Sequence, residues 1–129
     1  MQKRVLVILL SLFLATFVFT SVDAQSKSVY WNRWDVLINN VDVTNNHFDV
    51  TESYDINFSG SFRFGSATIP LTNLDSITNV AVSENGKALQ ANCGGQRAGT
   101  FCAENNSDGL SVVYYFFQPI NNASQQFEI

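Results

Sequence analysis

The stretch FDVTESYDINF, residues 48–58, alternates apolar and polar side chains, and only Glu52 breaks the apolar set. A period of two predicts a β-strand with one face in the core and the other in water. An earlier stretch repeats the pattern with Trp34, Val36 and Ile38 on one parity, and the polar residues 39–47 separate the two stretches. The chain after its first residues is therefore predicted to open with two half-buried strands.

Further strand and turn signals follow. Ser59-Gly60 ends the strand over residues 48–58, Pro70 marks an edge or a strand end, and Asn85-Gly86 is typical of a two-residue hairpin turn. Further strands are expected over residues 62–64, 77–83, 89–93 and 101–102, with a turn at 105–109 and a last strand from 125. We find no helical period of useful length. The pattern predicts an all-β fold, an antiparallel β-sandwich of about seven or eight strands.

The stretch LSVVYYFF, residues 110–117, is apolar on both parities. Such a run predicts a central strand that is covered on both faces, or one whose outer face meets a partner. The last residues, QQFEI, start a further strand with no polar tail after it. We therefore expect the domain of residues 25–129 to be truncated at its C-terminal end, so that a missing continuation supplies cover or a neighbouring strand.

The first 24 residues have the layout of a secretory signal peptide. Lys3 and Arg4 form a basic head, residues 5–19 are an apolar run, and compact side chains precede the end of the segment. We expect a signal peptide helix over residues 1–24, with cleavage between Ala24 and Gln25. The alternative is an uncleaved anchor, but a run of about 15 residues is shorter than the roughly 20 that cross a bilayer. The predicted location is extracellular or in the cell envelope, on the outer face of the membrane.

Charge is sparse and acidic. Lys3, Arg4 and Asp23 leave with the leader, so the 7 Lys and Arg fall to five, the 11 Asp and Glu fall to ten, and the formal charge is near −5. Nucleic-acid binding needs clustered Lys and Arg against the phosphates, and a polybasic membrane patch needs the same residues. We therefore expect no nucleic-acid partner, and a membrane link only through a missing C-terminal anchor.

Two cysteines, Cys93 and Cys102, bracket a segment that contains glycines. An even cysteine count in an exported protein predicts a disulfide. Closing so short a loop stabilises the fold by roughly 2.5–3 kcal/mol, because the unfolded chain loses entropy. Zinc is the alternative, but it needs four ligands, and the sequence has no second cysteine pair and no histidine cluster. We expect no metal and no other cofactor.

Several segments resemble a known family when they are taken in order. They are residues 34–38, 48–54, 58–65 (FSGSFRFG), 68–71 (TIPL) and 74–82. Together they are similar to the extracellular N-terminal domain of the YciQ-like predicted membrane proteins, a domain of unknown function. The resemblance implies a β-rich exported domain that is followed by a further β segment and a transmembrane anchor, and it implies no chemistry. The loop between Cys93 and Cys102 and the pair Asn45-Asn46 depart from the family.

Glu52 is the carboxylate most out of place in the pattern. The alternative function is a carboxylate-based extracellular hydrolase that uses Glu52 together with Asp35 or Asp55. An ion pair with Arg33 or Arg63, or a position at the rim of the sheet, explains a buried carboxylate equally well. We therefore predict no catalytic residues.

Other polar groups have ordinary explanations. His47 is the single histidine, and as a catalytic base it would need a nucleophile and an orienting acid, so we interpret it as part of a polar hairpin tip. The turn 105–108, and Asn40 with Asp42 and Asn45, carry oxygens that calcium accepts. Polar turns look the same without an ion, because Asn and Asp bond their own backbone.

Aromatic and asparagine residues complete the candidates. Tyr30 and Trp31 near the mature N-terminus offer flat surfaces for a sugar or a protein, but we expect at least one tryptophan to pack in the core. Asn57, Asn105 and Asn122 match the N-glycosylation acceptor pattern.

These patterns favour a binding module over an enzyme. We expect an exported, non-enzymatic β-sandwich domain of an envelope or membrane-anchored protein, which acts as an interaction or structural module. Its partner, an unknown protein or an envelope component, is not indicated by the sequence.

Overall fold

The computed structural model describes residues 26–129, and the predicted signal peptide and its cleavage point lie outside these residues. The described chain forms nine β-strands, which are β1 (Ser28–Asp42), β2 (His47–Ser59), β3 (Ser61–Ile69), β4 (Ser83–Glu84), β5 (Lys87–Ala88), β6 (Gln90–Ala91), β7 (Thr100–Asn106), β8 (Gly109–Asn121) and β9 (Ser124–Glu128). No helix among these residues is long and apolar enough to cross a membrane.

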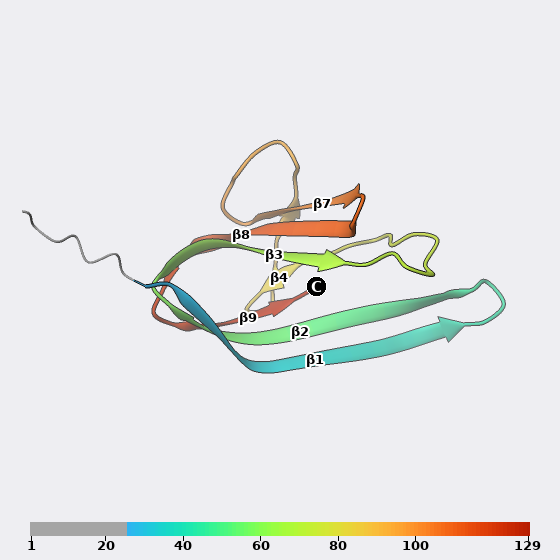
Figure 1. Ribbon diagram of the computed structural model, residues 1–129, viewed down its shortest axis with the longest axis horizontal. Helices are drawn as coiled ribbons and strands as arrows, with labels where there is room; N and C mark the ends of the chain where they lie inside the picture. Colours follow the sequence, from blue (N-terminus) through green and yellow to red (C-terminus); the bar gives the residue numbers. More distant parts are fainter. Residues whose placement is uncertain (1–25) are drawn as a thin grey trace, which may run out of the picture.

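The strands form two sheets, with the orders β1-β2-β9-β4-β5 and β3-β8-β7-β6. Neighbouring strands are antiparallel except β6 and β7, which are parallel. In Figure 1 the layer of β1, β2 and β9 faces the layer of β3, β7 and β8. The predicted all-β antiparallel sandwich is therefore confirmed. The structure has more strands than the seven or eight expected, because the total includes three very short ones, β4, β5 and β6, of two residues each.

The core lies between the two sheets. It consists of Tyr54, Ile56, Phe58, Val82, Leu89, Phe101, Leu110, Val112, Tyr114, Phe116, Ile120 and Phe127. Alternation along the strands decides the membership, because successive side chains of a strand point to opposite faces. In β2, Ile56 and Phe58 are buried while Asn57 between them is exposed.

The strand β8 contains the stretch that is apolar on both parities. It lies between β3 and β7, so it is a central strand, as the sequence predicts. Its even-numbered residues from Leu110 to Phe116 are buried, whereas the odd-numbered residues 111–117 are only half-buried. The outer face of β8 is therefore covered in part, with the Phe64 ring 6.0 Å from that of Tyr115.

The strand that was expected over residues 77–83 is largely absent. Only Ser83–Glu84 pair with other strands, as β4. Asn79 has a φ of 56°, a left-handed conformation that interrupts an extended backbone. The segment still contributes to the core, because Val82 is buried and its C=O accepts a hydrogen bond from Leu89 N–H at 2.8 Å.

The prediction that at least one tryptophan packs in the core is wrong. Trp31 and Trp34 are 50% and 62% exposed. Both lie on β1, which is the edge strand of its sheet, and the β1–β2 hairpin projects beyond the rest of the described chain (Figure 1). The contrast is sharp within one cross-strand pair, since Trp34 lies opposite Tyr54, which is only 6% exposed. The core ends at β2.

The stability of the fold is expected to depend on pH through Tyr114, the buried tyrosine of β8. Burial raises the pKa of the Tyr114 phenol from 10.0 to about 12, so the folded state favours the neutral form. Its contribution to stability is complete below pH 10 and is lost as the pH rises towards 12, because the unfolded chain releases the proton first. We expect urea unfolding to show a loss of about 2–3 kcal/mol across this window. Tyr114→Phe should reduce the slope, and an unchanged slope would assign it to other groups.

Candidate functional site

The carboxylates of the alternative hydrolase lie on different faces of one sheet. In the β1–β2 register Glu52 lies opposite Val36, while Asp35 lies opposite Ser53. Side chains alternate between the faces of a sheet, so Glu52 projects from one face and Asp35 projects from the other. Asp55, three residues after Glu52 in β2, shares the face of Asp35. The fold therefore does not bring Glu52 together with either carboxylate.

Glu52 finds its partner within its own strand. The hydroxyl of Tyr54 donates a hydrogen bond to the Glu52 carboxylate. Burial, and next this hydrogen bond, raise the pKa of Tyr54. Arg33 instead forms an ion pair with Asp35 on the other face of the sheet, and no ion pair between Arg63 and Glu52 occurs among residues 26–129. Of the interpretations of Glu52, a place at the rim of the core agrees best with these contacts.

The two turns whose oxygens would suit calcium use those oxygens within the chain. Asp42 Oδ1 accepts hydrogen bonds from the N–H groups of Thr44 and Asn45 at 2.9 and 3.1 Å, and its Oδ2 accepts one from the Asn45 side chain at 2.9 Å. These bonds, led by the one from the Asn45 side chain, lower the pKa of Asp42. In the turn 105–109 Asn106 Oδ1 has the same role, accepting from two backbone N–H groups at 2.8 and 3.1 Å. Both turns are ordinary Asx-type turns.

The cysteines are joined, which confirms the predicted disulfide. Cys93 and Cys102 have an S–S distance of 2.02 Å and a Cα–Cα distance of 4.7 Å. Glu104 lies beside them, and the three residues are the one cluster of potential metal ligands in residues 26–129. Because both sulfurs are in the disulfide, the cluster offers no thiolate to zinc. His47 lies apart from it, exposed at the start of β2.

The three predicted glycosylation acceptors are all exposed. Asn57 lies within β2 and is paired on both sides, with Tyr30 and Ser124. Asn122 has a φ of 48°, and its Oδ1 accepts a hydrogen bond from Gly60 N–H at 2.7 Å. Asn105 lies beside a turn, and its side chain takes part in none of the described hydrogen bonds. Of the three acceptors, Asn105 is the one that combines both properties.

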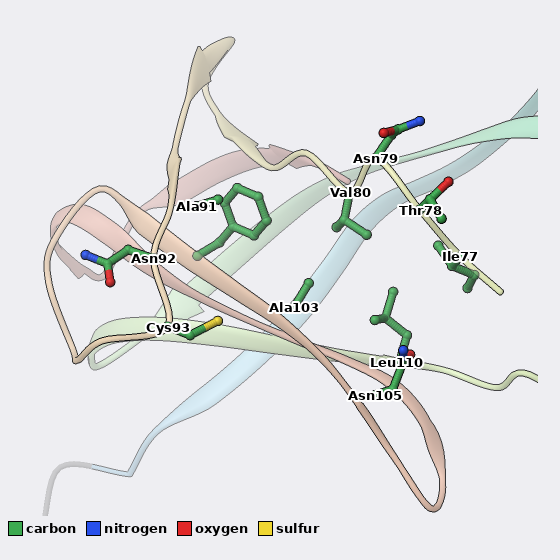
Figure 2. A pocket seen from close by; sticks show the side chains of 11 residues that line it. Ile77, Thr78, Asn79, Val80, Ala91, Asn92, Cys93, Ala103, Asn105 and Leu110 are labelled. Carbon is green, nitrogen blue, oxygen red and sulfur yellow. The ribbon is translucent and has the colours of Figure 1, made fainter.

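A shallow hollow of about 530 Å³ lies between the segment of residues 77–80 and the strands β6 and β7. Figure 2 shows its apolar side chains, among them Ile77, Val80 and Leu110, with Asn79, Asn92 and Asn105 around them. The lining contains no histidine, carboxylate, lysine or arginine. Such a hollow has no group for general acid–base catalysis, and it suits at most the binding of a small apolar group.

The largest unexplained feature is an apolar surface on the β1–β2 hairpin. We call it the hairpin face, and it consists of Trp31, Trp34, Val36, Ile38, Phe48 and Val50, all of which are exposed. Cross-strand pairs connect its members, since Ile38 lies opposite Val50. An aromatic cluster forms its inner end, with the rings of Trp31 and Trp34 6.1 Å apart and each within about 6 Å of Tyr54.

The hairpin face is the outward continuation of the core. Tyr54, Ile56 and Phe58 occupy the same parity of β2 as Phe48 and Val50, but only the first three are buried. The strand β9 pairs with β2 over residues 53–57, and Glu52 is the last residue of β2 towards the hairpin tip that bonds to the end of the chain, at Ile129. From Glu52 to the tip, β1 is the single strand that pairs with β2 in the described chain. The alternation therefore continues for several residues past the point where the second sheet stops covering it.

Sequence reasoning placed this surface in the core, and strand length was the signal that it overlooked. The two strands have 15 and 13 residues, against a usual strand of about 5–6. At about 3.4 Å per residue the hairpin is roughly 45 Å long. The facing sheet leaves the outer part of this length uncovered, since Phe48 and Val50 are both 45% exposed. Exposed apolar patches of this kind mark interaction sites in soluble proteins.

Comparison with protein-family models, with curated proteins and with solved structures finds no match. The resemblance of residues 34–86 to the YciQ-like domain stays a prediction.

Proposed function

We propose that this chain is an exported, non-enzymatic β-sandwich domain that acts as an interaction module, and that the hairpin face is the surface that binds its partner. The observation that carries the proposal is the exposure of six large apolar side chains on one face of a projecting hairpin. Water contact with such a surface is unfavourable, and burial against a partner removes it.

Two further observations support this proposal. The disulfide between Cys93 and Cys102 is compatible with an oxidising, extracellular location. The polar groups that the sequence offered for catalysis or for calcium are either separated, as Glu52 is from Asp35, or engaged in turns, as Asp42 is. Binding therefore accounts for more of the observed arrangement than catalysis does.

Site-specific photo-crosslinking tests the proposal in the cells that produce the protein. A benzophenone side chain at Ile38, which is 59% exposed on the hairpin face, is expected to give an adduct of defined mass. The matched control places the same group at Ser107, an exposed residue of the β7–β8 turn, and is expected to give none. The absence of an adduct at Ile38, or equal adducts at both positions, would contradict the proposal.

A further inference from the structure

The outer edge of β1 has few of the features that keep an edge strand from pairing. β1 is the terminal strand of its sheet and runs for 15 residues without proline or lysine. Its charged residues are Arg33, Asp35 and Asp42. Edge strands are usually short or protected by lysine, proline, bulges or cover, because their unpaired N–H and C=O groups bind another strand. The register shifts of β1 lie between Trp31 and Arg33 and between Asn39 and Asp42, and residues 33–39 between them are regular. In the described chain this edge is open and lies next to the hairpin face.

The pairing of β2 with the end of the chain tells which groups of β1 point outward. Glu52 N–H donates to the C=O of Ile129 and Ile129 N–H donates back, both at 2.9 Å. Both backbone groups of Glu52 therefore face away from β1, and its partner Val36 turns its own N–H and C=O to the outer edge. The same arrangement recurs at every second pair. The residues of β1 whose backbone N–H and C=O groups face the outer edge are Val29, Trp31, Trp34, Val36 and Ile38.

We propose that β1 pairs antiparallel with β1 of a second copy, about a two-fold axis at Trp34, so that two five-stranded sheets become one continuous sheet. This inference rests on the proposed function: the second copy pairs with the edge beside the hairpin face and joins the hairpin faces of the two copies into one surface. A two-fold contact uses the same patch on both copies. The strand therefore has to be complementary to itself.

Charge complementarity selects the register. Arg33 and Asp35 flank Trp34 and project from the face opposite to it. With Trp34 opposite Trp34, Arg33 of each copy lies opposite Asp35 of the other, which makes two reciprocal ion pairs. Shifting the axis to Asp35 places two carboxylates opposite each other, which is unfavourable. Shifting it to Val36 leaves Arg33 opposite Asn39, so both ion pairs are lost.

The apolar residues match in the same register. The register shift between Trp31 and Arg33 shows that β1 has one extra residue there relative to β2. When the second copy skips the same residue, Trp31 lies opposite Val36 and Val29 lies opposite Ile38. All of these side chains share one face of the sheet, so the apolar surfaces of the two hairpins join across the axis. Aromatic and aliphatic cross-strand pairs of this kind stabilise sheets.

Sedimentation velocity of the whole chain, expressed from Met1 and purified with its disulfide intact, tests this pairing. The wild-type chain is expected to be a reversible dimer. Arg33→Asp places two carboxylates opposite each other on either side of the axis and is expected to weaken the dimer by at least about tenfold. The exchange variant R33D/D35R restores both ion pairs and should restore the association. Mixing the separate variants R33D and D35R should also give a dimer.

Controls separate this result from altered folding or a general charge effect. R33D also places a carboxylate opposite Asp55 of β2 and removes the ion pair with Asp35, so its urea unfolding is compared with that of R33D/D35R, which has the same change opposite Asp55. Lys87→Asp, an equal charge reversal on β5 at the opposite edge of the same sheet, should leave the dimer unchanged. A dimer that R33D does not weaken, or that the exchange does not restore, would overturn the register.

The crosslink at Ile38 distinguishes failure of this inference from failure of the proposed function. In the dimer, its adduct is a second copy of the chain. A chain that is monomeric at every concentration and crosslinks at Ile38 to a different protein overturns the pairing but leaves the interaction module in place. A monomeric chain without any adduct overturns both.

Discussion

Phe127→Ala is expected to destabilise the fold by about 3–5 kcal/mol, the usual cost of removing a buried phenylalanine. Phe127 is 2% exposed, and its ring lies 5.0 Å from that of Phe116 and 5.2 Å from that of Tyr114. It belongs to β9, which joins β2 to β4 within the first sheet. Its truncation therefore leaves a cavity between the two sheets. The loss is a large part of the 5–15 kcal/mol that a domain usually has.

Urea unfolding at neutral pH measures this effect as a lower midpoint at an unchanged slope. Phe64→Ala is the matched control, because Phe64 is 56% exposed on β3, and it should cost less than about 1 kcal/mol. Phe127→Leu, which keeps most of the buried volume, should fall between the two. Equal losses for Phe127→Ala and Phe64→Ala would show that β9 does not close the core.

Glu84→Ala is expected to cost about 2–3 kcal/mol, because it leaves two half-buried donors without their acceptor. Glu84 is 5% exposed. One carboxylate oxygen accepts from Phe117 N–H at 2.8 Å and the other accepts from the Gln125 side chain at 2.5 Å. Phe117 lies where β8 passes a register shift against β3, so its N–H has no partner on that strand. The carboxylate therefore connects the two sheets.

The neighbouring carboxylate of Glu128 provides the control for Glu84. Glu128 lies on the adjacent strand β9 and is exposed, so Glu128→Ala should change the free energy of unfolding by no more than about 0.5 kcal/mol. Glu84→Gln keeps one acceptor oxygen and should lose less than Glu84→Ala. Both variants are compared with the wild type by urea unfolding. If Glu84→Ala were as mild as Glu128→Ala, the carboxylate would not be needed to satisfy Phe117.

Local pattern was sufficient for much of the architecture. Residues 48–58 and 110–117 carry their strand periods in the sequence, and both form long strands. The Asn85-Gly86 turn and the disulfide also depend on neighbouring residues alone, since a tight turn needs positive φ and a short loop brings its cysteines together. Residues 77–82 were mispredicted because apolar content alone does not show where an asparagine leaves the extended conformation.

The sequence shows which face of a strand is apolar, but it does not show whether another part of the fold covers that face. Val50 and Ile56 have the same parity in β2, yet Val50 is exposed and Ile56 is buried. The difference lies in how far β9 and the second sheet extend along the hairpin. Two of the strands involved, β8 and β9, are at least fifty positions away in the chain. The candidate binding surface therefore became visible only in the folded molecule.

The sequence by itself determined the long strands, their apolar parity, the acidic charge and the disulfide, because each of these follows from residues that are close together or from composition. The tertiary structure alone decided that β1 is an edge strand, that Glu52 and Asp35 are on opposite faces, and that Glu84 is buried. In the sequence Glu84 looks like a solvated residue of a hairpin turn. In the fold, an N–H of β8 that has no strand partner donates to the buried carboxylate of Glu84. Residues near Glu84 in the sequence do not indicate so distant a partner.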